Sequence, residues 1–429
     1  MRIDILAIGS RGDVQPFVAL GLGLQAAGHR VRIVTLNGFE DLVLGRGLDL
    51  LAIGESPREI AKTAEGREWV KNRSSSLGYL RGFVRIACAK LEEGIANYWA
   101  ACQDVEALIV SPMGVLVGAH IAERLKIPLI RAQVEPPAVP TLYSLDGRKS
   151  LAAALRTYRT AFIDVAFNLL GWMALRSSTN RARARVLSLP PLPLLWLKAR
   201  RLPLLCGYSP SVVPQLPDFG KWIHVTGYWF LDDLPGWTPS AELLAFLEDG
   251  PPPLFIGFGS TALPNPEAMT DLVVRAIERS GRRGILVSGG TGMATGRLSE
   301  SVLAVDFVPY AWLFERVSAV VHQGGAGVTG LALRAGLPSV TVPAFGVHPF
   351  WGKRLFELGA APLPIPASRL TEENLAAAIQ AATAGSMGSK AAAIGRRIRE
   401  EDGVACAVEI VNRHLGRPES VLVRHQYAH

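Results

Sequence analysis

The chain has 429 residues, 49% of them hydrophobic, a length that suggests two domains with a core each. Its formal net charge is +8, from 45 basic and 37 acidic residues. The four cysteines (Cys88, Cys102, Cys206 and Cys406) form no CxxC pair and stand apart from histidine clusters. Their spacing argues against a disulfide framework and a zinc site, and it favours a reducing cytoplasm.

The first predicted element is a strand rather than a signal peptide. Residues Ile3–Ile8 form one short apolar run that contains the acid Asp4 and ends at Gly9. No stretch of the chain reaches the ~20 uninterrupted apolar residues of a spanning helix. We therefore expect a soluble cytoplasmic protein, or one that lies peripherally at the inner membrane surface.

Strand and helix patterns alternate along both halves of the chain, which predicts an α/β fold with mainly parallel sheets. The first half is expected to contain strand Ile3–Ile8, loop Gly9–Asp13, helix Phe17–Ala27, strand Arg30–Thr35, and buried strands Leu108–Val110 and Pro128–Ile130. Apolar stretches at Leu77–Ala87 and Phe162–Leu175 favour a large hydrophobic ligand in this half, although they fit an ordinary helical core as well.

Basic residues concentrate between residues 148 and 201, where Asp164 is the single acid. The basic residues are Arg148, Lys149, Arg156, Arg159, Arg176, Arg181, Arg183, Arg185, Lys198, Arg200 and Arg201. They interleave with apolar segments that carry Trp172 and Trp196, a pattern that fits contact with a membrane surface. A solvated helical face over a core fits it equally. No nucleic-acid partner is expected, because no recognition motif accompanies the charge.

A Pro-rich stretch, Tyr208–Pro217, and the following Trp222–Pro235 are expected to connect the two domains. The second half then begins with strand Leu254–Ser260, and a final helix is expected at Cys406–His414. Further strands are expected at Gly284–Ser288, Val302–Val305, Ala319–Val321 and Ser339–Val342. We predict an N-terminal domain over 1–215, a linker over 216–240, a C-terminal domain over 241–405, and a helix and tail over 406–429.

The most informative segment is the glycine-rich turn after strand Ala319–Val321. His322 ends the strand, glycines occupy 324, 325 and 327, and a helical stretch follows at Leu331–Ala335. Glycine leaves backbone N–H groups uncovered, and the N-terminus of the next helix attracts anions. The turn therefore fits a phosphate site, and by itself it is equally compatible with a tight turn that binds nothing.

Several motifs together resemble family 1 of the GT-B glycosyltransferases (the UDP-glycosyltransferase superfamily), and within it the sterol 3-beta-glucosyltransferase-like branch. The motifs are Gly9–Phe17 with Gly28–His29, Val225–Asp233, Gly257–Ser260, Phe307–Phe314 and His322–Pro338. The resemblance implies two Rossmann-like, doubly wound parallel-sheet domains that face a cleft. It also implies an inverting hexosyltransferase that needs no metal and no cofactor, since the nucleotide-sugar donor is a co-substrate.

By the same resemblance, the donor is UDP-glucose or a UDP- or dTDP-deoxysugar, and the acceptor is a hydroxyl of a sterol, hopanoid, carotenoid or polyketide-type aglycone. The catalytic residues are Asp13, the base on the acceptor hydroxyl, and His322, which stabilises the departing diphosphate. The expected donor-binding residues are Arg11, Gly12, Ser260, Phe307, Val308, His322, Gly324, Gly325, Ala326, Gly327, Val328, Val347 and His348.

Three of these roles have a structural alternative. Asp13 could serve purely as a cap for the helix that follows it. His322 could be an ordinary histidine at a strand end. Phe307, expected to stack on the nucleotide base while the Val308 backbone reads its edge, could be a core phenylalanine.

The chain also departs from the family pattern. Gln323 and Ala326 stand where relatives commonly have His and Ser, and Val347 and His348 stand where the branch usually has Asp and Gln. The Asp-Gln pair holds sugar hydroxyls, so its absence favours a deoxysugar or another modified donor. A catalytically silent nucleotide-sugar or lipid-binding protein is therefore the alternative function, and a nucleotide-sugar epimerase of the same fold is a weaker one.

Overall fold

The computed structural model describes residues 1–72, 76–137, 151–193, 202–231, 236–259, 263, 265–344 and 346–416, with residues 58, 70–72, 76, 77, 79, 151–168 and 218 described by their backbone alone. The chain forms two compact units. The first comprises Met1–Asn72, Leu77–Leu231 and the residues from Asp402 onward, and the second is built mainly on Asp232–Glu401. The last helix of the chain therefore belongs to the first unit.

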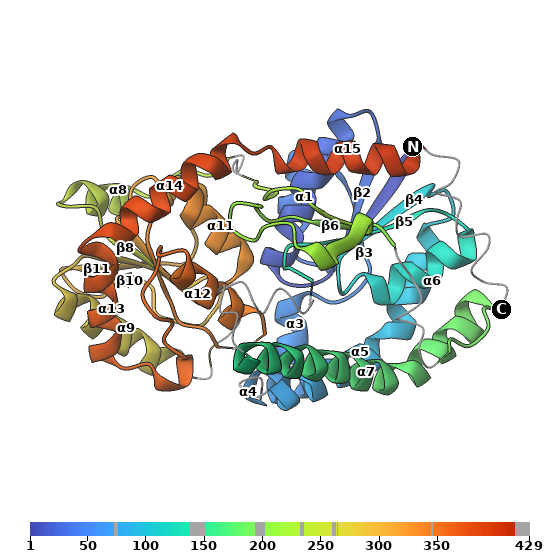
Figure 1. Cartoon of the computed structure of the whole chain (residues 1–429), viewed down its shortest axis with the longest axis horizontal. Coiled ribbons are helices and arrows are strands. Elements are labelled where there is room, and N and C mark those ends of the chain that lie inside the picture. The colour runs from blue at the N-terminus through green and yellow to red at the C-terminus, as the bar shows by residue number, and fades with distance from the viewer. Residues whose placement is uncertain are drawn as a thin grey trace. The chain divides into compact units, whose positions relative to one another are not determined.

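The first unit contains a seven-stranded sheet with strand order β3-β2-β1-β4-β5-β6-β7 (Figure 1). Its strands are β1 (Arg2–Leu6), β2 (Arg30–Thr35), β3 (Asp49–Ala52), β4 (Ala107–Val110), β5 (Leu129–Gln133), β6 (Leu204–Cys206) and β7 (Ile223–Val225). Every neighbouring pair is parallel. The predicted parallel sheet is confirmed, and all of its strands end at one edge.

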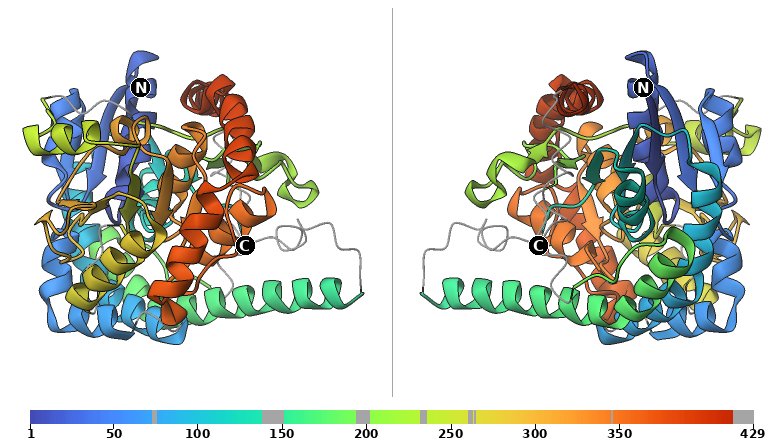
Figure 2. Two further views of the ribbon diagram at one scale, coloured as in Figure 1. Left: turned by 90° about the vertical axis from the view of Figure 1, so that its left-hand side faces the viewer. Right: turned by 90° about the vertical axis from the view of Figure 1, so that its right-hand side faces the viewer.

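Helices α1 (Arg11–Ala26), α5 (Ser76–Ala101), α6 (Val115–Leu125) and α7 (Leu151–Leu187) are the long helices of this unit. The shorter ones are α2 (Glu40–Val43), η1 (Leu44–Arg46), α3 (Pro57–Lys62), α4 (Ala64–Asn72) and η4 (Pro217–Trp222). The N-terminal half of α7 extends away from the rest of the unit (Figure 2). Helix α1 begins six residues earlier than predicted and contains Pro16. Pro16 has no N–H, so it donates no helical hydrogen bond to the carbonyl of Gly12, four residues earlier. Gly12 is exposed, so water can bond to this carbonyl instead.

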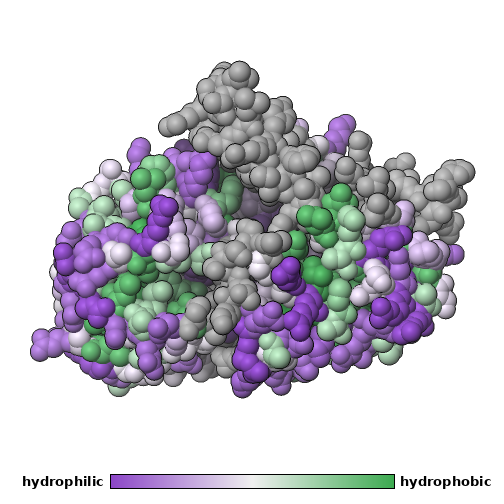
Figure 3. Space-filling view, turned by 90° about the horizontal axis from the view of Figure 1, so that it is seen from below, coloured by the Kyte–Doolittle hydropathy of each residue, from purple (hydrophilic) through white to green (hydrophobic). Residues whose placement is uncertain are grey.

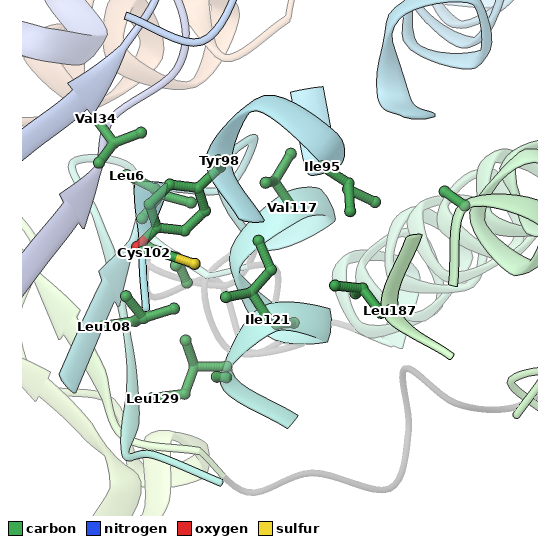
Figure 4. Packing of buried hydrophobic residues seen from close by; sticks show 14 of the residues in the cluster. Leu6, Val34, Ile95, Tyr98, Cys102, Leu108, Val117, Ile121, Leu129 and Leu187 are labelled. Atoms are coloured by element: carbon green, nitrogen blue, oxygen red, sulfur yellow. The ribbon is translucent and has the colours of Figure 1, made fainter. Parts of the chain in front are cut away.

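The core of the first unit lies between its strands and helices α5, α6 and α7 (Figure 4). Leu6, Leu108 and Ile121 are fully buried there. Asp4 is also buried, and its carboxylate accepts hydrogen bonds from Tyr98 Oη at 2.7 Å and Arg32 Nη2 at 2.7 Å. Burial raises the pKa of Asp4, while Arg32 and Tyr98 oppose the shift. The charged group is tolerated because it is fully paired.

The second unit contains a six-stranded sheet with strand order β10-β11-β9-β8-β12-β13. Its strands are β8 (Leu254–Gly257), β9 (Gly284–Val287), β10 (Gly296–Arg297), β11 (Val302–Val305), β12 (Ala319–His322) and β13 (Ser339–Thr341). All pairs are parallel except β10 with β11. Its helices are α8 (Ala241–Glu248), α9 (Pro266–Ser280), α10 (Tyr310–Phe314), α11 (Ala326–Arg334), α12 (His348–Glu357), η5 (Ala367–Arg369), α13 (Glu372–Thr383) and α14 (Ser386–Glu400).

The predicted connector differs from the structure at its start. Residues Ile223–Val225 form edge strand β7 of the first sheet, where the Thr226 N–H continues the pairing to the Cys206 carbonyl at 3.0 Å. Three residues are too few to show an alternating pattern, so this strand could not be read from the sequence.

The predicted C-terminal helix is confirmed as α15 (Gly403–Leu415), and it packs on α1. The two helices meet closely at Gly23, where an added Cβ would collide with the side chain of Val404. His29 Nε2 and Asn412 Oδ1 lie 2.7 Å apart. Helix α15 thereby lies alongside α1 in the first unit (Figure 1).

One basic side chain of α7 lies inside the core of the first unit rather than on its surface. Arg183 is buried and pairs with Glu123 at 2.9 Å, and Trp172 is buried in the same core. On the same helix Leu170 and Met173 are exposed, and the face that carries α5 and α7 mixes hydrophilic with hydrophobic side chains (Figure 3). Among the described residues, no helix has both the length and the apolar character to cross a membrane. Arg148, Lys149, Trp196, Lys198, Arg200 and Arg201 lie outside the described residues.

The contact between α1 and α15 gives a stability prediction. Gly23→Ala should lower the free energy of unfolding by about 1–3 kcal/mol, because the added methyl overpacks the contact with Val404. The matched control is Gly94→Ala on α5, where the nearest atom to an added Cβ lies at 3.9 Å, so the methyl group has room. Because alanine forms helices better than glycine, this variant should be as stable as the unaltered chain or more stable. Urea unfolding measures both, and equal stability of the two variants would contradict the close packing.

Candidate active site

The first group of candidate residues lies at the carboxyl end of β1. The Ser10 N–H donates to Asp13 Oδ2 at 2.7 Å, and the Ser10 hydroxyl donates to the same oxygen at 2.8 Å. Ser10 is the N-cap of α1 and Asp13 its third residue, so the carboxylate does cap the helix. Among the described contacts none involves the other oxygen, Oδ1, which remains available to a ligand.

Glycine is required beside this carboxylate. Gly9 has φ +149°, and a Cβ at that position would lie 2.5 Å from Asp13 Oδ2. The neighbouring loop after β4 is tied to the same place, because the Ile8 N–H donates to Ser111 Oγ at 3.2 Å and the Ser111 N–H donates to the Leu6 carbonyl at 2.9 Å. Asp13 is thus held by Ser10 and packs closely against Gly9, and the loop after β4 is bonded to the chain just before them.

Burial raises the pKa of the Asp13 carboxyl, and the hydrogen bonds from Ser10 oppose the shift. A carboxylate with a raised proton affinity is a better general base than an exposed one. The group can therefore cap α1 and accept a proton.

Glu135 is a candidate residue that the sequence reasoning missed. It follows strand β5 at the same edge of the sheet, and burial, together with the negative charge of Asp13, raises its pKa to about 7. A single glutamate after a short strand belongs to no motif, so its proximity to Asp13 could be found only from the fold.

Arg11 and Gly12, two of the predicted donor-binding residues, form the first turn of α1. Arg11 Nε donates to Gln15 Oε1 at 3.2 Å, and Gln15 Nε2 donates to the Leu231 carbonyl at 3.3 Å. Gly12 is exposed, and the nearest atom to an added Cβ would be Ser10 Oγ at 3.9 Å. Both residues lie next to Asp13 in the first unit.

The second group of candidate residues surrounds His322 at the end of β12 in the second unit. Its side chain is fully buried, and Nδ1 accepts a hydrogen bond from the Gly324 N–H at 3.1 Å. Burial and, to a smaller extent, the neighbouring His348 together lower the pKa of His322 to about 3. The ring is therefore neutral, with its proton on Nε2, and among the described residues Nε2 has no hydrogen-bond partner. A buried N–H donor without a partner marks a place for an acceptor.

The glycine-rich turn lets three loops meet around this histidine. Gly324 has φ +93°, and a Cβ there would lie 2.7 Å from the His348 carbonyl oxygen. Gly259, after β8, has φ +86°, and its Cβ would lie 2.7 Å from Gln323 Nε2. The chain after β8, β12 and β13 is thus closely packed, with the Gln323 side chain against Gly259 and the His348 carbonyl against Gly324.

The turn leads directly into α11, whose N-cap is Gly325. Ala326 is buried, whereas Gly327 is exposed and Val328 partly exposed. The first N–H groups of an α-helix have no partner within the helix, so this end of α11 presents donors and the positive end of the helix dipole. The predicted phosphate-binding turn therefore has the expected backbone form.

The remaining candidates lie at the same edge of the second sheet. Phe307, after β11, is 39% exposed, so it is not a core phenylalanine, whereas the side chain of Val308 is fully buried. Val347 is 40% exposed at the N-cap of α12, and His348 begins that helix. Ser260 lies outside the described residues. In the described part of the chain, no three His, Cys, Asp or Glu side chains are grouped as metal ligands would be.

Two family models match the chain, one in each half. Residues 3–144 match the glycosyltransferase family 28 N-terminal domain. Residues 285–414 match the C-terminal domain of erythromycin biosynthesis protein CIII-like proteins. The candidate residues Arg11, Gly12, Asp13 and Glu135 lie in the first match, and His322 and the glycine turn lie in the second.

Curated relatives cover nearly the whole chain. The sterol 3-beta-glucosyltransferase of Aspergillus clavatus is 35% identical over 97% of this chain, and that of Yarrowia lipolytica is 36% identical over 98% of it. The chain spans only 30% and 29% of the length of these two relatives.

Solved structures share the fold at lower identity. The glycotransferase of kitacinnamycin has a TM-score of 0.65 at 19% identity, with 96% of this chain and 99% of that chain covered. The spinosyn rhamnosyltransferase SpnG has a TM-score of 0.65 at 16% identity, with coverage of 96% and 100%. Glycosyltransferase VinC, solved in complex with dTDP, has a TM-score of 0.63 at 17% identity, with coverage of 96% and 99%.

The buried neutral histidine gives a prediction on pH and stability. The unfolded chain protonates His322 near pH 6.5, whereas the folded chain does so near pH 3, so the unfolded state binds more protons between these values. As the pH falls from about 7 to about 4, His322 should therefore lower the free energy of unfolding of the unaltered chain by roughly 3–5 kcal/mol. His322→Gln should not show this part of the loss. Urea unfolding at several pH values measures this difference, and identical pH profiles would show that His322 is not buried neutral.

Proposed function

We propose that the chain is a two-domain GT-B glycosyltransferase of the sterol 3-beta-glucosyltransferase-like branch, and that it transfers a hexose from a nucleotide diphosphate sugar to a hydroxyl of a hydrophobic acceptor. The transfer inverts the configuration at C1 and uses no metal or other cofactor. The observation that supports this most directly is the neutral His322, whose unpartnered Nε2–H lies beside a glycine turn and the N-terminus of α11.

The donor diphosphate lies at the N-terminus of α11 in this proposal. Negative charge grows on the oxygen that leaves C1, and donors fixed in advance stabilise it without reorganisation. The backbone N–H groups of Gly324, Gly325, Ala326, Gly327 and Val328 supply such donors, and His322 Nε2–H adds one from the strand end. The exposed ring of Phe307 stacks on the nucleotide base, and backbone groups of Val308 form hydrogen bonds with the edge of the base. Ser260, Arg11 and Gly12 make the remaining contacts with the donor.

The acceptor hydroxyl is activated by Asp13. Its oxygen attacks C1 from the face opposite the diphosphate, the bond from C1 to the phosphate oxygen breaks, and the hydroxyl proton passes to the Asp13 carboxylate. The raised pKa of Asp13 supports this role, since the carboxylate holds the proton more strongly than an exposed aspartate would. Its hydrogen bonds with Ser10 keep it in place while Oδ1 accepts the proton.

The acceptor is a sterol, hopanoid, carotenoid or polyketide-type aglycone. The relatives at 35–36% identity are named sterol 3-beta-glucosyltransferases, while the structural neighbours include glycosyltransferases of kitacinnamycin and spinosyn. A lipid acceptor would be reached from the cytoplasmic membrane surface, and the exposed Leu170 and Met173 on α7 support a peripheral contact there.

A catalytically silent binding protein of the same fold is the second candidate function. The feature that favours it is the glycine turn, where Gln323 and Ala326 stand in place of the His and Ser of the family pattern, so that by this resemblance one or two side-chain contacts with phosphate are missing. Gln323 fills the space beside Gly259, and its Oε1 is buried without a described partner. Donor binding would survive these changes through the backbone, whereas turnover requires Asp13 and His322.

Two substitutions separate the base from the phosphate site. Asp13→Asn can still accept the Ser10 N–H, so it should keep the fold and the binding of UDP or dTDP while acceptor-dependent turnover falls roughly a hundredfold or more. His322→Ala should weaken binding of the diphosphate and lower turnover together. Thermal shift with UDP, dTDP and GDP, and product assays with a sterol, measure the two effects.

The outcomes that contradict these roles differ between the two variants. Near-normal turnover of Asp13→Asn would leave Asp13 as a helix cap alone. Unchanged diphosphate binding by His322→Ala would show that the donor does not lie at this turn. Diphosphate binding by the unaltered chain without turnover on any acceptor would favour the silent binding protein.

Donor choice follows from positions 347 and 348 at the start of α12. Val347 is exposed and apolar, so it makes no hydrogen bond to a sugar hydroxyl, and a site of this kind discriminates weakly between glucose and its deoxy analogues. We expect the chain to use a dTDP- or UDP-deoxysugar at least as well as UDP-glucose. The double change Val347→Asp with His348→Gln should shift the ratio of kcat/KM values toward UDP-glucose.

Competition assays with paired donors measure that ratio directly. If the unaltered chain strongly prefers UDP-glucose and the double variant shows no higher ratio, these two positions do not determine which sugar is used.

A further inference from the structure

Two histidine rings face each other in the first unit, apart from the residues assigned to catalysis. His224 lies on edge strand β7, and His414 lies in the last turn of α15. Their Nε2 atoms are 3.4 Å apart, and the ring centroids are 5.6 Å apart with an angle of 60° between the ring planes. Strands β4, β5 and β6 separate β7 from β1, the strand that precedes Asp13. The pair therefore lies in a different part of the sheet from the proposed base.

Packing at both ends of α15 helps to set the distance between the rings. At the start of the helix, an added Cβ at Gly403 would collide with the Tyr228 carbonyl oxygen, so the helix backbone touches the chain just after β7. Near its end, Asn412 Oδ1 lies 2.7 Å from His29 Nε2. Neither contact involves the two facing rings. The fold itself therefore brings the rings together.

The separation of the two nitrogens fits a shared metal ion better than a hydrogen bond. A good N–H hydrogen bond spans about 2.7–3.2 Å, less than the 3.4 Å observed here. Zinc binds histidine nitrogen at about 2.0–2.1 Å, and a tetrahedral angle then places two ligand nitrogens roughly 3.3–3.4 Å apart. Because the terminal ring torsion of histidine is broad, small rotations can direct both lone pairs at one ion.

The surroundings favour the neutral imidazole, which is the form that binds metal ions. Burial lowers the pKa of His224, and the neighbouring His414 and Arg413 contribute in the same direction. Arg413 itself pairs with Glu409 on the same helix, Nη2 to Oε1 at 2.5 Å, so part of its charge is neutralised. Both rings are partly exposed, which gives an ion from solvent access to them.

We propose that His224 and His414 form a binding site for a divalent transition-metal ion, which links the end of α15 to the edge strand of the first sheet. Imidazole nitrogen suits Zn²⁺, Ni²⁺ and Cu²⁺, whereas Mg²⁺ and Ca²⁺ prefer oxygen ligands. In the described part of the chain no third His, Cys, Asp or Glu joins the pair, so water fills the other positions and binding is reversible. The site takes no part in the proposed sugar transfer and does not depend on it.

The first test is zinc binding by the full chain after treatment with EDTA and dialysis. Titration calorimetry should show a zinc site, and the melting temperature should rise with ZnCl2 concentration, because an ion that binds the folded state stabilises it. MgCl2 at the same concentration should have no such effect. His224→Gln and His414→Gln should each weaken zinc binding roughly tenfold or more, since each variant loses one of the two ligands.

The matched control is His29→Gln, which changes a histidine that also contacts α15 but faces Asn412 instead of a second ring. This variant should bind zinc as the unaltered chain does. Glutamine is chosen for all three positions because it retains a side chain that can form hydrogen bonds. Circular dichroism without metal shows whether each variant is folded.

The second test is hydrogen exchange of the unaltered chain, which does not depend on the folding of any variant. Zinc should slow the exchange of backbone amides in α15 and β7, because the ion links these two elements. Amides of α9, in the second unit, should exchange at the same rate with and without zinc.

Three results would overturn the inference. Zinc binding that is unchanged in both His224→Gln and His414→Gln would place the ion elsewhere in the chain. Zinc binding without slower exchange in α15 would show that the ion does not link the helix to β7. A melting temperature of the unaltered chain that is the same in ZnCl2 and MgCl2 would show that the two rings do not form a metal site.

Discussion

The parallel register of the two sheets is the constraint on which the candidate site depends. In a parallel sheet every strand ends at the same edge, and the following loops must pass one another there in little space. Glycine at positions 9, 259 and 324 permits that approach, since a Cβ at any of them would collide with a neighbouring loop or side chain. The crowded edges hold Asp13 in the first unit and His322 in the second.

The hydrogen bond from the Gly324 N–H to His322 Nδ1 shows how the backbone determines chemistry. It fixes the tautomer, so the proton lies on Nε2, and burial keeps the ring neutral. A neutral histidine donates one hydrogen bond without adding a full charge, which suits a site that must both hold a diphosphate and release it. The substitutions at Gln323 and Ala326 leave this backbone arrangement intact.

Much of the fold could be predicted from the sequence, because buried parallel strands are continuous apolar runs and each is followed by a helical pattern. Strand Arg30–Thr35 is found as predicted, as are the turn after His322 and the final helix. Strands β6 and β7 have three residues each, too few to show a period. The return of α15 to the first unit depends on its fit against Gly23, which no local pattern reveals.

The candidate site was predictable only where a motif marked it. Asp13, His322 and the glycine turn lie in motifs, whereas Glu135 has none, and its raised pKa arises from burial and from Asp13, two features of tertiary structure. The exposure of Phe307 likewise could not be read from its apolar neighbours.

The central claim is that this chain transfers a sugar, and the consumption of donor with and without an acceptor tests it most directly. Purified protein is incubated with UDP-glucose or a dTDP-deoxysugar, and release of the nucleoside diphosphate is followed by chromatography. We expect release only when a hydrophobic alcohol such as a sterol is added, with one glycoside formed for each diphosphate. Donor conversion to another nucleotide sugar without any acceptor, as an epimerase would produce, would contradict the account.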